Sequence, residues 1–120
     1  MKTLQELENL GDNELSQILA SMNGWEFCIR ARTKHGKPLP WTMEHCRHPS
    51  YTCGRWRPMG RMVKYAQDLN ACHEVEMRLA NDCDYISYLR TITKGEAIDM
   101  IFAPARLRTI ALILTLQATD

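Results

Sequence analysis

The hydrophobic period of this chain changes at Asn23-Gly24, and this change constrains the fold more than any other feature. Before it, apolar side chains recur at the spacing of one helix face: Leu15, Ile18, Leu19 and Met22. After it, the stretch "WEFCIRAR" alternates, with one side formed by Trp25, Phe27, Ile29 and Ala31. The sequence therefore predicts a helix that ends near Gly24, followed by a half-buried strand.

Three further helices are indicated by local signals. Thr3 and Glu6 form a capping box for a short first helix, and Asp68 is a good N-cap for a helix over 69–80. Pro104 precedes an apolar run over 105–116, which predicts an almost wholly buried closing helix.

The remaining strand signals are weaker. "KHGKP" predicts a turn, and 39–43 a returning edge strand. The segment 84–93 fits either a helix or a strand, and with the alternating segment 97–102 we interpret it as a hairpin. Helices at both ends and in the middle, with strands between them, indicate an α+β class, with a small antiparallel β-sheet packed with helices in a single domain.

A resemblance to a known family rests on three short motifs. A tryptophan on an early strand, then "YAQDLNACHEVEMRL", then "APARLRTIALILTL" resembles the phage ABA-sandwich domain, a family of small bacteriophage and prophage proteins. The matching positions, within residues 12–117, are Tyr65, Asp68, Ala71, Val75, Leu79, Ala105 and Arg106. The resemblance implies phage origin and a fold with a helix, two strands and a closing helix. It implies no settled biochemical role.

The composition argues against several classes of protein. The start of the chain lacks the apolar stretch of a signal peptide, and no apolar run approaches the roughly 18 residues of a membrane span. Five cysteines, an odd number, favour reduced thiols over a disulfide framework. We therefore expect a cytoplasmic protein of the bacterial host cell with no membrane association.

The sequence offers no recognisable catalytic motif. It has no phosphate-binding glycine loop and no nucleophile elbow, and "HEVE" lacks the second histidine of a metalloprotease. Cys72 and His73 adjoin on a predicted helix, so their side chains diverge by about 100° and do not form a catalytic pair. We expect a protein that is not an enzyme and uses no cofactor.

A weak metal signal lies in "HCRHPSYTC". Its four zinc donors, His45, Cys46, His48 and Cys53, fall within nine residues. Structural zinc sites normally combine two close donors with a second pair a dozen or more residues away. We therefore favour a reading in which the cysteines fill small apolar spaces and the histidines lie on the surface, and we predict no metal.

The strongest functional signal is a basic and aromatic loop of about twenty residues over 44–64, because loops that long are usually functional or disordered. Guanidinium groups grip phosphates and aromatic rings stack on bases. The candidate ligand-binding residues are Tyr51, Arg55, Trp56, Arg57, Arg61 and Lys64, with Arg106 and Arg108 from the first turn of the last helix. In the alternative, these arginines make salt bridges with Glu6, Glu8 and Glu14, and Trp56 packs the loop onto the core.

Together, the loop and the family resemblance lead to one functional expectation. It is a phage-encoded, non-catalytic protein that counters host defence by sequestering a phosphorylated nucleotide signal. The alternatives are a protein–protein inhibitor of the anti-CRISPR type, which docks on an acidic surface of a host nuclease or effector, and a structural phage accessory protein. A homo-oligomer is compatible with each of them.

Overall fold

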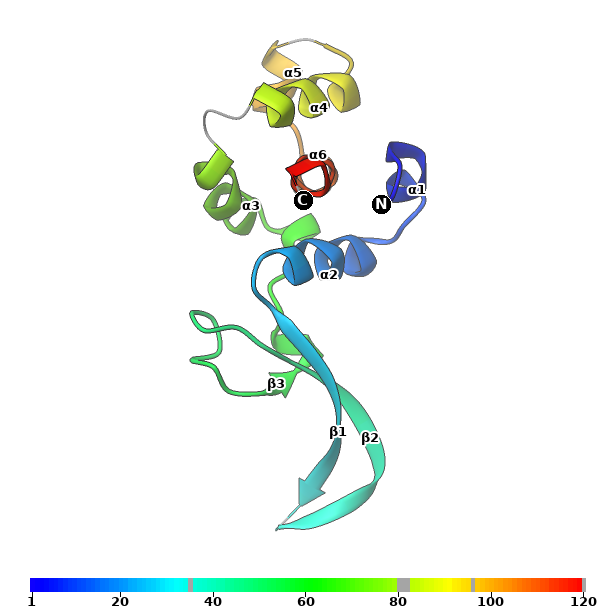
Figure 1. Cartoon of the computed structure of the whole chain (residues 1–120), viewed down its shortest axis with the longest axis vertical. Helices are drawn as coiled ribbons and strands as arrows, with labels where there is room; N and C mark the ends of the chain where they lie inside the picture. Colours follow the sequence, from blue (N-terminus) through cyan, green and yellow to red (C-terminus); the bar gives the residue numbers. More distant parts are fainter. Residues whose placement is uncertain (35, 80–82, 96, 120) are drawn as a thin grey trace. The chain divides into compact units, whose positions relative to one another are not determined.

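The structure is a computed structural model that describes residues 1–34, 36–79, 83–95 and 97–119. The chain forms two compact units. We call residues 1–22 and 63–120 the helical unit, and residues 23–62 the hairpin unit. Figure 1 shows the elements of both units.

The helical unit is arranged around its last helix. In Figure 1, α6 (Ala105–Thr119) is seen end-on, with α1 (Leu4–Glu8), α2 (Asp12–Met22), α3 (Leu69–Glu76) and α4 (Cys83–Thr93) around it. Shorter elements complete the unit: the 3-10 turns η2 (Tyr65–Gln67) and η3 (Met77–Leu79), and helix α5 (Ala97–Ile101).

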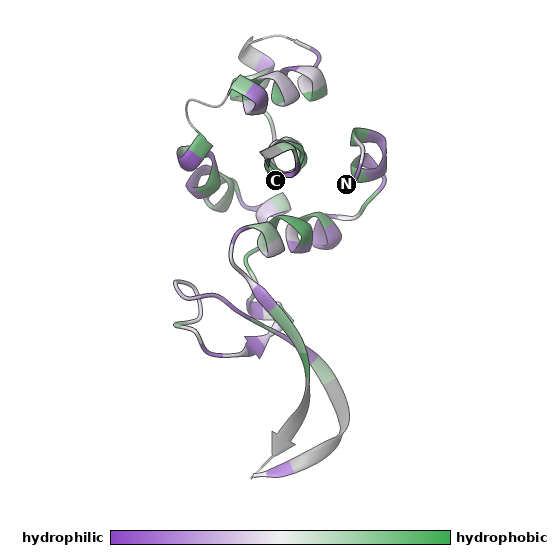
Figure 2. Cartoon of the chain, viewed as in Figure 1, coloured by the Kyte–Doolittle hydropathy of each residue, from purple (hydrophilic) through white to green (hydrophobic). Residues whose placement is uncertain are grey.

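Helix α6 is buried on all sides, as its sequence predicts. Five successive residues, Ile110 to Leu114, are each at most 8% exposed. Most of the helix carries the hydrophobic colour in Figure 2, whereas α2 shows both colours. A helix that is apolar all round must be enclosed, so the other helices pack around this one.

Both predicted helix caps are confirmed. The Thr3 side chain accepts a hydrogen bond from the Glu6 amide, and the Asp68 carboxylate accepts from the amides of Asn70 and Ala71. These bonds satisfy amide groups that the first turn of a helix leaves without partners. On α2, Leu15 and Leu19 are fully buried, which confirms the predicted apolar face.

The predicted hairpin over 84–102 is wrong. Residues 83–93 form α4, and the second segment contains α5. Tyr85 and Leu89, one helical turn apart, are buried, so packing overrides the strand preference of the β-branched residues. The hydroxyl of Thr93 donates to the Leu89 carbonyl at 2.8 Å, a bond that accommodates threonine within a helix. The helix ends at Thr93, and Lys94 and Gly95 after it have positive φ, 65° and 97°, which glycine adopts readily.

The hairpin unit is a three-stranded antiparallel sheet in the order β1-β2-β3. Its strands are β1 (Glu26–Lys34), β2 (Lys37–Arg47) and β3 (Arg57–Pro58), followed by the 3-10 turn η1 (Met59–Arg61). The register pairs Glu26 with Arg47 at one end of the ribbon and Lys34 with Lys37 at the other. The predicted α+β class with a small antiparallel sheet is therefore confirmed.

Two sequence predictions about this sheet need correction. Strand β2 continues to Arg47 and β3 begins at Arg57, so the irregular segment is 48–56 rather than 44–64. Trp25 is buried as predicted, at 3% exposure, but Ile29 is 69% exposed. Ile29 pairs with Glu44, one position past the residues of β2 that pair with β3. Among the described side chains, the predicted inward face therefore extends to the half-buried Phe27, and the side chain of Ala31 lies outside that description.

Candidate anion-binding site

The hairpin unit contains a pocket of about 500 Å³ with a strongly cationic lining. Its walls come from the irregular segment, β3 and η1, and are formed by Tyr51, Thr52, Cys53, Arg55, Arg57 and Arg61. Four of the predicted ligand-binding residues are thus brought together here. None of these six described lining residues is acidic.

The three arginines of the pocket are exposed. Within the parts of the chain that the structure describes, none of their guanidinium groups pairs with a carboxylate. Three like charges around one concavity repel one another, and an anion inside it would relieve this repulsion. The arrangement therefore has the charge and shape expected of an anion site.

The segment before the pocket is held in place by His48. The His48 carbonyl accepts hydrogen bonds from the amides of Thr52 (3.1 Å) and Gly54 (3.3 Å), and the Thr52 hydroxyl accepts from the His48 amide at 3.0 Å. The histidine ring adds two bonds. Its Nδ1 accepts from the Ser50 amide at 3.0 Å, and its Nε2 lies 3.1 Å from the Asn23 carbonyl oxygen. A carbonyl only accepts, so Nε2 is the donor in this contact.

The turn itself uses two left-handed residues. Cys53 has φ of 54° and Gly54 has φ of 74°. The left-handed conformation costs about 1 kcal/mol or more for a residue other than glycine. The Arg55 amide then donates to the Thr52 carbonyl at 3.0 Å, which directs the chain back along the pocket wall. This turn brings Arg55 to the lining of the same pocket as Tyr51.

A cluster of three rings supports Tyr51. Its ring stacks on Trp25, with centroids 5.4 Å apart and planes 21° apart, and meets the His48 ring edge-on at 4.9 Å. Trp25 is buried, whereas Tyr51 is 39% exposed and lines the pocket. The tyrosine is therefore an aromatic surface of fixed orientation next to three positive charges.

Trp56, one of the predicted ligand-binding residues, packs against another side chain of the hairpin unit. The Arg47 guanidinium lies 4.4 Å from the centre of the Trp56 ring, and its Nε and Nη2 both donate to one Glu26 carboxylate oxygen, at 3.0 and 2.8 Å. Trp56 thus packs against an internal cation and is not among the residues that line the pocket. Lys64 belongs to the helical unit and is also outside that lining.

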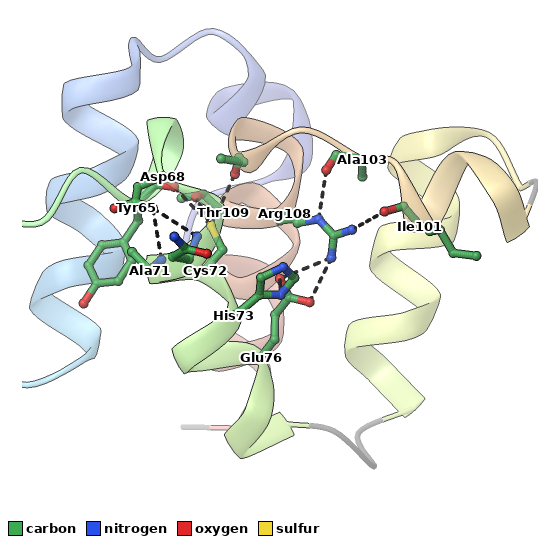
Figure 3. Close-up of polar contacts among 12 residues, drawn as sticks. Tyr65, Asp68, Ala71, Cys72, His73, Glu76, Ile101, Ala103, Arg108 and Thr109 are labelled. Carbon is green, nitrogen blue, oxygen red and sulfur yellow. Dashed lines mark hydrogen bonds and ion pairs between the residues drawn. The ribbon is translucent and has the colours of Figure 1, made fainter.

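Arg106 and Arg108 hold the helical unit together. Arg106 pairs with Asp12 at 2.7 Å and donates to the carbonyls of Glu8 and Leu10. Arg108 is buried, and it binds both oxygens of the Glu76 carboxylate, at 2.9 and 3.2 Å (Figure 3). Its remaining donors reach the carbonyls of Met100, Ile101 and Ala103.

These contacts favour a structural role for both arginines over the predicted ligand role. The observed contacts agree with the alternative of structural salt bridges, but the acidic partners differ from those expected. Neither Glu6, Glu8 nor Glu14 supplies the carboxylate, because Asp12 and Glu76 do.

The thiol next to His73 is also structural. Cys72 is fully buried and lies 3.1 Å from the Tyr65 carbonyl oxygen and 3.4 Å from the Thr109 hydroxyl (Figure 3). Burial raises the pKa of the Cys72 thiol, so at neutral pH it is protonated and a poor nucleophile. Burial likewise raises the pKa of Cys46 and of Tyr85.

The four residues that the sequence offers as weak zinc candidates have separate roles. His45 contacts the Met43 carbonyl, and the buried Cys46 thiol lies 3.7 Å from the Pro58 carbonyl oxygen. His48 uses both ring nitrogens internally, and Cys53 lines the pocket. Among the residues that the structure describes, no three histidines, cysteines or carboxylates are grouped so that they could hold a metal ion.

Comparison with protein-family models, with curated proteins and with solved structures gives no match to this chain. The relation to the phage ABA-sandwich family therefore stays a prediction from sequence motifs. One part of its expected pattern, the two strands between the Asp68 helix and the closing helix, is replaced by α4 and α5. None of the helices in the described parts of the chain has the length and apolarity needed to cross a membrane.

Proposed function

We propose that the hairpin unit binds the phosphate groups of a nucleotide in the pocket formed by Arg55, Arg57 and Arg61. The observation that carries this proposal is the convergence of three arginines, which have no carboxylate partner among the described residues, beside the stacked, half-exposed ring of Tyr51. Guanidinium groups bind phosphate oxygens with two parallel hydrogen bonds, and a tyrosine ring offers a base a flat apolar partner.

The role is binding rather than catalysis. The pocket contains cationic and aromatic groups and one thiol, but none of its described lining residues is a carboxylate or histidine that could act as a general base. A pocket also suits a narrow ligand better than the flat acidic surface of a protein. Sequestration of a nucleotide signal as a counter to host defence extends this proposal, and it rests on the family resemblance alone.

The test measures nucleotide binding through its effect on the thermal unfolding of the protein. A nucleotide at 100 times its dissociation constant stabilises the protein that binds it by about 2.7 kcal/mol, a clear rise in melting temperature. A panel of nucleoside mono-, di- and triphosphates and cyclic dinucleotides covers the expected chemistry. We expect a shift that grows with phosphate number, because each added charge meets the same three arginines.

Matched variants distinguish binding in the pocket from binding to exposed arginines in general. Arg55→Gln with Arg57→Gln removes two pocket charges, whereas Arg90→Gln removes an exposed arginine from α4 of the helical unit. The first should abolish the nucleotide shift and the second should leave it intact. A panel without any shift, or equal shifts in both variants, would rule out the pocket as a nucleotide site.

A further inference from the structure

The two units of the chain carry opposite charge. Residues 23–62 contain eight arginines and lysines against two glutamates, a formal charge of +6. The helical unit contains seven such cations against twelve carboxylates, a formal charge of −5. The overall charge of +1 therefore conceals a 40-residue unit with the positive field typical of nucleic-acid-binding modules.

The positive residues of the hairpin unit extend well beyond the pocket. The pocket arginine Arg57 pairs with Cys46, near one end of the β1–β2 ribbon, and Cys46 in turn pairs with Phe27. The other end of the ribbon is the pair Lys34 and Lys37. Lys34 lies seven positions after Phe27 along the strand, which at about 3.3 Å per residue is a span of about 23 Å.

This end of the ribbon has two further basic residues. The register pairs Lys34 with Lys37, so two lysines occupy paired positions at the end of the two strands. Two cations at paired positions favour a negatively charged ligand along the ribbon. A single nucleotide in the pocket is too short to reach across about 23 Å, whereas a chain of nucleotides repeats its phosphates along its length.

The aromatic cluster indicates which form of nucleic acid fits. The ring of Tyr51 is 39% exposed, is stacked on Trp25 and borders the arginine pocket. Sequence-tolerant proteins for single strands combine such a stacking ring with a cationic track for the backbone. A duplex hides the faces of its bases, so only an unpaired base could stack on this tyrosine.

We propose that the hairpin unit binds single-stranded nucleic acid, with one phosphate group in the arginine pocket, a base on Tyr51, and the backbone continuing toward Lys34 and Lys37. This inference rests on the proposed function, since it assigns the ligand class of the same pocket. It adds the second contact region at the end of the ribbon and the preference for unpaired bases.

The experiment measures fluorescence anisotropy of the full chain with labelled oligonucleotides of about 16 nucleotides, the upper site size of small single-strand-binding domains. The probes are a DNA strand, an RNA strand, the DNA duplex and a labelled mononucleotide. With about five phosphate contacts, the logarithm of affinity should fall against the logarithm of salt with a slope of about −3.5, roughly a 100-fold loss between 50 and 200 mM salt. The strands should bind at least tenfold more tightly than the mononucleotide and the duplex.

Three sets of variants separate the contacts. Lys34→Gln with Lys37→Gln should reduce the salt slope by about 1.4 for strands and leave mononucleotide binding unchanged. Arg55→Gln with Arg57→Gln should weaken the binding of strands and of the mononucleotide. Tyr51→Ala should weaken strand binding at least fivefold, whereas Tyr51→Phe retains it, because the stacking ring is preserved. The unfolding transition of each variant shows that it is folded.

The outcomes distinguish the inference from the proposed function. If the mononucleotide binds but strands bind no more tightly, and the lysine variant changes nothing, the strand inference is wrong and the nucleotide pocket stands. Equal binding of duplex and strand overturns the single-strand assignment. If the strands bind and the mononucleotide does not, the inference stands and binding of free nucleotides is ruled out. If no probe binds, both proposals are wrong.

Discussion

Replacing Arg108 with methionine should unfold the helical unit at a much lower temperature than wild type. Arg108 is 8% exposed, and its guanidinium binds the Glu76 carboxylate through two contacts of 2.9 and 3.2 Å. Removing one partner of a buried ion pair costs about 3–5 kcal/mol, because the other charge is left uncompensated. Three carbonyls at the end of α5 and just beyond it also lose their donor.

This magnitude sets a clear expectation for thermal unfolding followed by circular dichroism. For a domain of this size, each kcal/mol corresponds to about 4–8 °C, so the melting temperature should fall by at least about 12 °C. Arg90→Met, an exposed arginine on α4, is the matched control and should change stability by no more than about 0.5 kcal/mol. A loss below about 1 kcal/mol for Arg108→Met would refute the structural role given to this arginine.

Three further predictions concern stability. Trp25→Ala should destabilise the hairpin unit by about 3–5 kcal/mol in urea unfolding, as large buried aromatics do, and a loss under about 1 kcal/mol would contradict its place at the centre of the ring cluster. His48→Phe retains the ring but loses two hydrogen bonds, so it should cost about 1–3 kcal/mol and weaken nucleotide binding, and unchanged binding would show that the turn does not depend on it. Stability should decline as pH rises above about 9, since the folded state holds the Cys72 proton more tightly than the unfolded state, whose thiol titrates near the ordinary value of 9.0. Unfolding titrations between neutral and alkaline pH check this, and a flat profile, or one unchanged by Cys72→Ala, would contradict it.

The parts of the fold that the sequence predicts correctly depend on short-range signals. Thr3 and Asp68 cap the helices that follow them because their partners lie within three residues. The apolar run of α6 has one physical outcome, burial, whatever surrounds it. Segment 84–93 carries conflicting signals, and only its packing against α6 decides that Tyr85 and Leu89 form a helical face.

The candidate site likewise combines features that short-range sequence signals predict with features that depend on contacts between distant residues. Arg55, Arg57 and Arg61 lie close together in sequence, so their convergence could be predicted from composition and spacing. Arg106 and Arg108 look equally available in the sequence, yet their carboxylate partners are 94 and 32 residues away. The role of His48 was missed because its ring binds main-chain atoms, which carry no sequence signal. The Ser, Thr and Gly content of 50–54 was the available hint of a tight turn.

The central claim is that the arginine pocket binds nucleotide phosphates, and calorimetric titration of a nucleoside triphosphate into the full chain tests it most directly. Wild type should bind one nucleotide per chain, with an affinity that weakens as salt rises, because exposed charges are screened over about 10 Å at 0.1 M. Arg55→Gln with Arg57→Gln should lose the binding heat while its unfolding transition stays within about 1 kcal/mol of wild type. Undiminished binding in that variant, or no binding in wild type at low salt, would contradict the account.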